Sequence, residues 1–216
     1  VIAAGGVALP DLDQGVGHRL AVLVQHRAHP AIDRAGDDDY TCVVEQPLVY
    51  PSPQTMGTAN ASLCQGVGFG ARRDDTGTHR SGGLGVLRDL AGSDSYTGAT
   101  FVQGVGYWFG VGLLADGSGD DQYDGLFYAQ AAAAHFALGF LLEGGGNDLY
   151  ELVLKPINAV LGLGHDFSSA LLVEGGGDDH YRGSSRSLEA AYASASFSVT
   201  RSSNMRSWCP TAATSG

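Results

Sequence analysis

Residues 116–123 read Asp-Gly-Ser-Gly-Asp-Asp-Gln-Tyr, and four other stretches repeat the core of this phrase. The shared template is Gly-(Asp/Asn/Ser)-Asp-x-Tyr, with one more carboxylate three residues before the Gly. The other copies end at Tyr40, Tyr96, Tyr150 and Tyr181. The five tyrosines are 56, 27, 27 and 31 residues apart, so the period is about 27 residues with insertions. A fixed period of this size indicates stacked copies of one supersecondary unit.

Between the phrases the chain alternates bulky and small residues. Between Gln103 and Leu114 four glycines share one parity, and five bulky residues share the other: Val105, Tyr107, Phe109, Val111 and Leu113. This alternation predicts a strand, because successive side chains of a strand point to opposite faces. The Ala-rich segment 131–140 alternates in the same way, and four glycines in its partner would cost a helix several kcal/mol. We therefore predict strand in both copies.

The Gly- and Asp-rich phrases favour tight turns between these strands. A unit of about 27 residues with two or so strands and one turn is about one coil of a parallel β-solenoid. We therefore predict an all-β fold, a parallel β-solenoid (β-helix) of about six coils with loop insertions. Equivalent residues in successive coils would lie roughly 4.8 Å apart and form columns. The expected columns are a tyrosine stack (Tyr40, Tyr96, Tyr123, Tyr150, Tyr181) and an amide ladder (Gln14, Gln65, Gln103, Gln130).

The spacing also predicts the domain organisation. The solenoid is expected to span residues 1–200, with insertions near 41–64 and 71–81 and a last strand near 191–200. A Ser-rich tail at 201–216 is expected to be loosely ordered. Cys42 and Cys64 bracket the longer insertion, and the sequence leaves open whether they form a disulfide or remain thiols, while Cys209 lies in the tail.

The charge of the chain is concentrated in the repeats. The formal net charge is −11, and thirteen of the 23 acidic residues occupy the acidic positions of the repeat template. The other ten acidic residues are balanced by twelve basic residues. The sequence has no basic stripe, which argues against nucleic acid as a partner. The sequence holds no run of 18 apolar residues, so we expect no membrane span.

Stacking would bring the repeated acids together. At a separation of 5 Å and an effective dielectric near 20, each neighbouring pair of carboxylates repels by roughly 3 kcal/mol. Three arrangements can offset this repulsion: a shared hard cation, partial protonation, or outward-pointing and fully solvated side chains. Calcium fits the first, because it accepts six to eight oxygens in flexible geometry. The candidate metal ligands are Asp33, Asp38, Asp89, Asp94, Asp116, Asp121, Glu143, Asp148, Glu174 and Asp179.

The phrase at 116–123 resembles the calcium-binding nonapeptide of RTX-type β-roll proteins, Gly-Gly-x-Gly-x-Asp-x-hydrophobic-x. Gly117, Gly119, Asp121 and Tyr123 match its second Gly, later Gly, Asp and hydrophobic positions. The copies at 145–150 and 176–181 match comparably, and those at 36–40 and 92–96 match less fully. An acid replaces the first Gly in every copy, and the phrase occurs once per 27 residues and not in tandem. The resemblance covers about 40 of the 216 residues and implies calcium binding at these turns.

These observations lead to a primary functional hypothesis and alternatives. We expect a non-enzymatic structural or adhesive module of bacterial origin, secreted or at the cell surface, with calcium-binding turns and end-to-end self-association. The alternatives are a carbohydrate-active enzyme or a glycan-binding solenoid, with the site on the insertion loops or on a flat Gly/Ala face. The insertion Arg72–Arg80 combines acids, a histidine and arginines, and is the best enzymatic candidate. His135 stands where the preceding copy has Trp108, which indicates a tolerant surface column.

Overall fold

The computed structural model describes residues 29–42, 61–72, 77–152, 161–182, 196–200 and 206–208. Every regular element in these residues is a β-strand, so the described fold is all-β. None of them belongs to a helix that is long and apolar enough to cross a bilayer. Gln14 and most of the 41–64 insertion lie outside the described residues.

The strands form two six-stranded sheets, one four-stranded sheet and one two-stranded sheet. The first sheet contains, in order, β1 (His29–Ile32), β5 (Leu84–Arg88), β9 (Val111–Ala115), β12 (Leu138–Glu143), β15 (Ser169–Glu174) and β17 (Ser196–Thr200). The second contains β2 (Asp39–Thr41), β6 (Ser95–Thr97), β10 (Gln122–Gly125), β13 (Leu149–Leu152), β16 (His180–Arg182) and β18 (Arg206–Trp208). The four-stranded sheet contains β4 (Gly68–Phe69), β8 (Gly106–Tyr107), β11 (Ala133–Ala134) and β14 (Gly164–His165), and the smallest pairs β3 (Ala61–Cys64) with β7 (Thr100–Val102).

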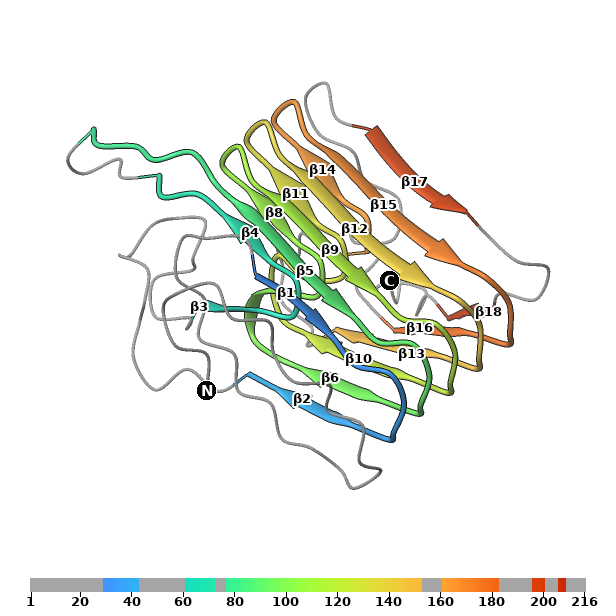
Figure 1. Cartoon of the computed structure of the whole chain (residues 1–216). Helices are drawn as coiled ribbons and strands as arrows, with labels where there is room; N and C mark the ends of the chain where they lie inside the picture. The colour runs from blue at the N-terminus through green and yellow to red at the C-terminus, as the bar shows by residue number, and fades with distance from the viewer. Residues whose placement is uncertain are drawn as a thin grey trace, which may run out of the picture.

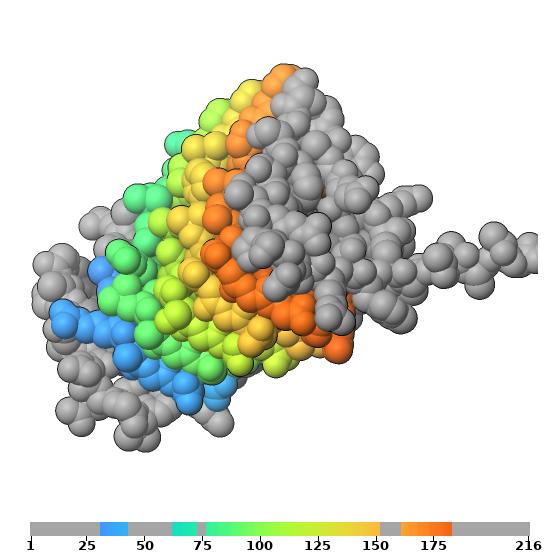
Figure 2. Space-filling model, turned by 90° about the vertical axis from the view of Figure 1, so that its right-hand side faces the viewer, coloured from blue at the N-terminus to red at the C-terminus, as the bar shows by residue number. Residues whose placement is uncertain are grey.

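All pairings between these strands are parallel, and the predicted repeat sets their register. Val111 pairs with Leu138, and Tyr123 pairs with Tyr150, one period of 27 residues later. Figure 1 shows the strands of each sheet side by side, and in Figure 2 the described repeats follow one another as bands in sequence order. This arrangement of parallel sheets is compatible with a β-solenoid.

The predicted tyrosine stack is confirmed. The rings of Tyr40, Tyr96, Tyr123, Tyr150 and Tyr181 stack with centroids 4.7–4.9 Å apart and planes within 5° of parallel. The amide ladder is also present for the described glutamines. The Gln103 Nε2 group donates to the carbonyl of Tyr96 in its own repeat and to that of Asp124 in the next. Both columns lie in the interior and connect neighbouring repeats.

The strand predicted from Gln103 to Leu114 is divided by a corner. Trp108 and Phe109 have φ angles of 47° and 57°, in the left-handed region, and they separate β8 from β9. His135 and Phe136 repeat this corner between β11 and β12, with φ angles of 61° and 59°. The corner reverses which parity faces inward: Tyr107 is buried before it, whereas Val111 and Leu113 of the same parity are partly exposed after it, and Gly110, Gly112 and Leu114 are buried.

The inward glycines allow the four-stranded sheet to pack directly on the first sheet. A Cβ atom at Gly112 would lie 2.1 Å from the backbone oxygen of Val105, and one at Gly85 would lie 2.1 Å from that of Val67. Backbone therefore packs against backbone at this contact. The flat Gly/Ala face, which we considered as a glycan-binding surface, is thus interior and is not available to a ligand.

The outer face of the first sheet is apolar. Leu84 and Leu138 are exposed, and Val86, Leu113, Phe140 and Leu171 are partly exposed on β5, β9, β12 and β15. Three phenylalanines at the corner continue this surface: Phe109, Phe136 and Phe167 are 49–62 % exposed. Their rings stack with centroids 5.2 Å apart. A chain with a net charge of −11 therefore displays an ordered apolar surface.

The predicted insertions and tail fall partly within the described residues. An antiparallel bridge between Ala71 and Arg80 closes the base of the 71–81 insertion, whose residues 73–76 lie outside the description. A disulfide joins Cys42 to Cys64, which the sequence had left open. In the tail, predicted to be loosely ordered, residues 206–208 form β18 and pair with β16.

The glycine contacts give a direct test of the packing. We expect Gly112→Ala to lower the free energy of unfolding by about 1–3 kcal/mol or more, because overpacking forces the backbone apart. Gly83→Ala is the matched control, since a Cβ there meets nothing within 4 Å. Urea unfolding followed by circular dichroism measures both variants. Equal stability of the two would contradict the backbone contact.

Candidate functional site

The first acidic column contains one residue from each repeat, at the C-terminal end of the strand of the first sheet. Its members are Asp33, Asp89, Asp116, Glu143 and Glu174. In Asp89, Asp116 and Glu143 one carboxylate oxygen accepts from the backbone amide two residues later, as Oδ1 of Asp116 does from Ser118. The other oxygen of these three residues accepts from a buried tyrosine hydroxyl: Tyr96 donates to Asp116 Oδ2 at 2.6 Å, and Tyr123 donates to Glu143 Oε2 at 2.5 Å. The turn and the tyrosine stack thus fix these carboxylates.

The second acidic column runs beside the first and follows a different pattern. Its members are Asp38, Asp94, Asp121, Asp148 and Asp179. The backbone amide of Asp94 donates to Asp121 Oδ1 at 2.7 Å, and that of Asp121 donates to Asp148 Oδ1 at 2.8 Å. Each Oδ1 therefore links one repeat to the next. Among the described residues, the Oδ2 atoms of Asp94, Asp121 and Asp148 are buried and have no hydrogen-bond partner.

The two columns bring the carboxylates into groups of three. One oxygen from each member of a group lies within 4.8 Å of the others. The groups are Asp33-Asp38-Asp89, Asp89-Asp94-Asp116, Asp116-Asp121-Glu143 and Asp148-Glu174-Asp179. Each of these clusters can hold a metal ion. All ten candidate ligands from the sequence occur in them.

Burial separates these carboxylates from ordinary turn acids. No member of either column is more than 8 % exposed, whereas Asp37, Asp39 and Asp120 in the same turns are exposed. Of the three arrangements considered from the sequence, full solvation is therefore wrong for the ten column residues. A shared cation and bound protons remain.

The electrostatic environment favours the protonated form of these acids when no cation is present. Burial, together with a smaller contribution from nearby carboxylates, raises the pKa of Asp94, Asp121 and Asp148 to about 8 each. Burial likewise raises the pKa of Glu174 to about 8 and that of Asp116 to about 7. Hydrogen bonds from backbone amides and tyrosine hydroxyls oppose these shifts without cancelling them.

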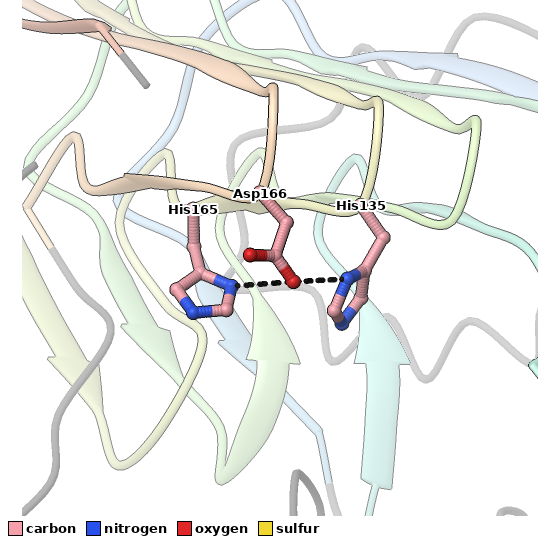
Figure 3. A group of neighbouring side chains, drawn as sticks. All are labelled: His135, His165 and Asp166. Atoms are coloured by element: carbon pink, nitrogen blue, oxygen red, sulfur yellow. Dashed lines mark ion pairs between the residues drawn. The ribbon is translucent and has the colours of Figure 1, made fainter. Parts of the chain in front are cut away.

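A second polar cluster lies at the corner between β14 and β15, and sequence reasoning missed it. His135, His165 and Asp166 converge there, as Figure 3 shows. His135 does occupy the position equivalent to Trp108, as predicted, but it is only 4 % exposed, so the prediction of a tolerant surface column was wrong. Aligning residues 164–167 with 133–136 through their phenylalanines would have revealed the cluster. The four-residue insertion in this repeat obscures that alignment.

The 71–81 insertion packs beside this cluster. The Arg72 guanidinium carbon lies 5.3 Å from the centre of the Trp108 ring, and the ring centroid of His79 lies 5.0 Å from that of Trp108. Arg72 Nη1 is also 3.0 Å from His135 Nε2. Burial and the nearby Arg72 cation lower the pKa of His135, while Asp166 raises it. The residues of the enzymatic candidate thus meet the second cluster.

No family model, no curated protein and no solved structure matches this chain.

The raised pKa values predict an unusual dependence of stability on pH. A carboxyl with a pKa of about 8 in the folded state and 3.8 when unfolded binds more protons when folded. The stability of the metal-free protein should therefore be highest near pH 4, fall as the pH rises to 8, and level off above it. Thermal unfolding in metal-depleted buffers between pH 4 and 9 measures this. A midpoint that rises between pH 4 and 7 would contradict the burial of these charges.

Proposed function

We propose that this chain is a structural or adhesive module, a parallel β-solenoid of about six coils that binds calcium in its buried acidic columns. The buried Oδ2 atoms of Asp94, Asp121 and Asp148 carry this proposal. A buried carboxylate oxygen without a partner costs more than one that is hydrogen-bonded, and a cation supplies the missing interaction.

The donor set favours calcium over softer metals. Each group of three offers only carboxylate oxygens, and Ca²⁺ prefers six to eight oxygen ligands at 2.3–2.6 Å. Asp116 belongs to two groups and can bridge ions in neighbouring repeats. A row of such ions would connect successive repeats along the two acidic columns, where the carboxylates otherwise repel one another.

One observation supports an exported or cell-surface location, and the proposed calcium binding is compatible with it. The disulfide between Cys42 and Cys64 fits an oxidising compartment, because thiols of cytosolic proteins are kept reduced. Calcium sites of extracellular modules work at dissociation constants of about 10⁻⁴–10⁻³ M, so modest affinity at these columns would suffice.

The apolar outer face of β5, β9, β12 and β15 supports an adhesive role. Exposed apolar residues that form one continuous patch commonly mark interaction surfaces. We propose that this face binds a cell-surface or glycan partner, and that the outermost strands of the described sheets, β1 and β2 at one end and β17 and β18 at the other, permit end-to-end association. Monodisperse short particles in electron microscopy would contradict the association into fibres.

The matched substitutions Asp121→Asn and Asp120→Asn test the calcium proposal. Wild-type protein at pH 8 should unfold at a higher temperature in millimolar calcium than in EDTA, since a ligand at 100 times its dissociation constant contributes about 2.7 kcal/mol. Asp121→Asn should raise the midpoint in EDTA, because it removes a buried charge, and should reduce the calcium response. Asp120→Asn, an adjacent and exposed change, should retain that response.

Two results would overturn the calcium proposal. The first is an absence of any calcium response in the wild type at pH 8, which would assign the columns to bound protons. The second is an equal response in the two variants, which would place the calcium effect outside Asp121.

One observation favours a second candidate function, a carbohydrate-active enzyme. Arg72 and His79 from the insertion meet Trp108 and His135, so basic and aromatic side chains gather at one corner. If this corner cleaves acidic polysaccharides, His79→Ala should reduce the rate at least tenfold with no loss of thermal stability, because His79 is exposed. Reducing-end release from uronate polymers measures the rate. Inactive wild-type protein would exclude that substrate class.

A further inference from the structure

The second polar cluster has the geometry of a metal site distinct from the acidic columns. His135 follows β11, and Asp166 follows β14 in the next repeat. Because Ala134 pairs with His165, the side chains of His135 and Asp166 arise from equivalent positions. Asp166 Oδ2 lies 2.8 Å from Nδ1 of His135 and 3.3 Å from Nδ1 of His165. Both rings turn their Nδ1 atoms toward this one oxygen (Figure 3).

We propose that His135, His165 and Asp166 bind a transition-metal ion of the Zn²⁺ type. A tetrahedral zinc ion with bonds of 2.0–2.1 Å holds its ligands about 3.3 Å apart. The three donor atoms lie within 4.8 Å of one another, and the two measured distances are close to that ligand separation. Two imidazole nitrogens and one carboxylate oxygen suit zinc, cobalt or nickel, whereas calcium requires oxygen ligands.

Within the described part of the chain the cluster provides three protein ligands and no fourth. His135 is buried, while the side chains of His165 and Asp166 are 36 % and 39 % exposed. The cluster is thus closed on the side of the core and open toward solvent. Three protein ligands with one free position are typical of zinc sites that bind water or a substrate, whereas structural zinc sites have four protein ligands.

The two histidine rings can adopt the tautomer that a metal ion at Nδ1 requires. In the metal-free form Nδ1 of His135 can donate a proton to Asp166 Oδ2, which is 2.8 Å away. An ion bound at the Nδ1 atoms of both rings takes the place of any proton there, and each neutral imidazole then carries its proton on Nε2. Arg72 Nη1 lies 3.0 Å from Nε2 and 3.5 Å from Nδ1 of His135. A hydrogen-bond donor on the lone-pair axis of Nε2 would lie about 5 Å from Nδ1. Arg72 Nη1 is closer to Nδ1 than this, so it lies off the axis and leaves room for a proton on Nε2.

The local charge indicates what binds at the open position. A divalent ion adds two positive charges beside the Arg72 guanidinium, and Asp166 supplies one negative charge. The loaded cluster is therefore cationic, and an anionic fourth ligand such as hydroxide or a carboxylate would stabilise it. Trp108, which contacts Arg72, provides an apolar wall at the same corner.

Cobalt titration tests this site separately from the acidic columns. The full chain is stripped with EDTA, saturated with calcium to occupy oxygen-only sites, and titrated with Co²⁺, whose visible absorption is strong only in tetrahedral sites. We expect one tetrahedral Co²⁺ per chain, displaced by Zn²⁺. His165→Ala should weaken binding at least tenfold. His180→Ala, which removes an exposed histidine of β16 outside the cluster, should leave it unchanged.

Substitutions at the solvent side of the cluster separate metal binding from folding. His165 and Asp166 are partly exposed, so their substitution spares the core, and the unfolding midpoint in EDTA verifies this. Asp166→Asn retains an acceptor oxygen and the size of the side chain but removes the charge, and should also weaken Co²⁺ binding. No tetrahedral absorption in the wild type, or equal Co²⁺ affinity in His165→Ala, would overturn the proposal. Neither result would affect the calcium response of the acidic columns.

Discussion

In-register parallel pairing is the constraint on which the rest of this structure depends. The backbone hydrogen bonds between neighbouring strands hold equivalent residues roughly 4.8 Å apart. Each repeated residue type is therefore forced into contact with its own copies. For Tyr96 and Tyr123 this contact is favourable, since their rings lie 4.9 Å apart and nearly parallel. For Asp94 and Asp121 it is unfavourable, because it places like charges side by side in the interior.

The hydrogen bonds around the acidic columns do not remove this conflict. A hydrogen bond to a charged group contributes about 1.5–3 kcal/mol, and one pair of carboxylates at this spacing repels by roughly 3 kcal/mol. Asp94, Asp121 and Asp148 of the second column have acidic neighbours in both columns, but a backbone amide on only one of their oxygens. The balance therefore remains unfavourable for a fully ionised column. Protons or cations must complete the fold, so its stability depends on the composition of the solution.

The sequence predicted the repeat, the columns and all ten clustered carboxylates, because a period reports which residues are equivalent. It did not predict which side of the backbone faces inward. The alternation through residues 103–114 continues unchanged, but the left-handed residues Trp108 and Phe109 turn the chain and reverse the buried parity. The sequence also did not show which acids of a turn phrase are buried. Asp120 and Asp121 are adjacent in one phrase, yet only Asp121 faces the interior.

The second polar cluster shows a further limit of reasoning from repeats. Uniform columns, such as the tyrosines, build the scaffold and can be recognised by their identity. The column of Trp108, His135 and Asp166 changes residue type at every step, so from sequence alone it looks tolerant of substitution. In the structure, the change is what brings an imidazole and a carboxylate to adjacent repeats, 2.8 Å apart. Within one column, identical residues contact only their own kind, so a contact between different groups of the same column requires that the column varies. In this chain such variation coincides with the 71–81 insertion, which places Arg72 against the same corner.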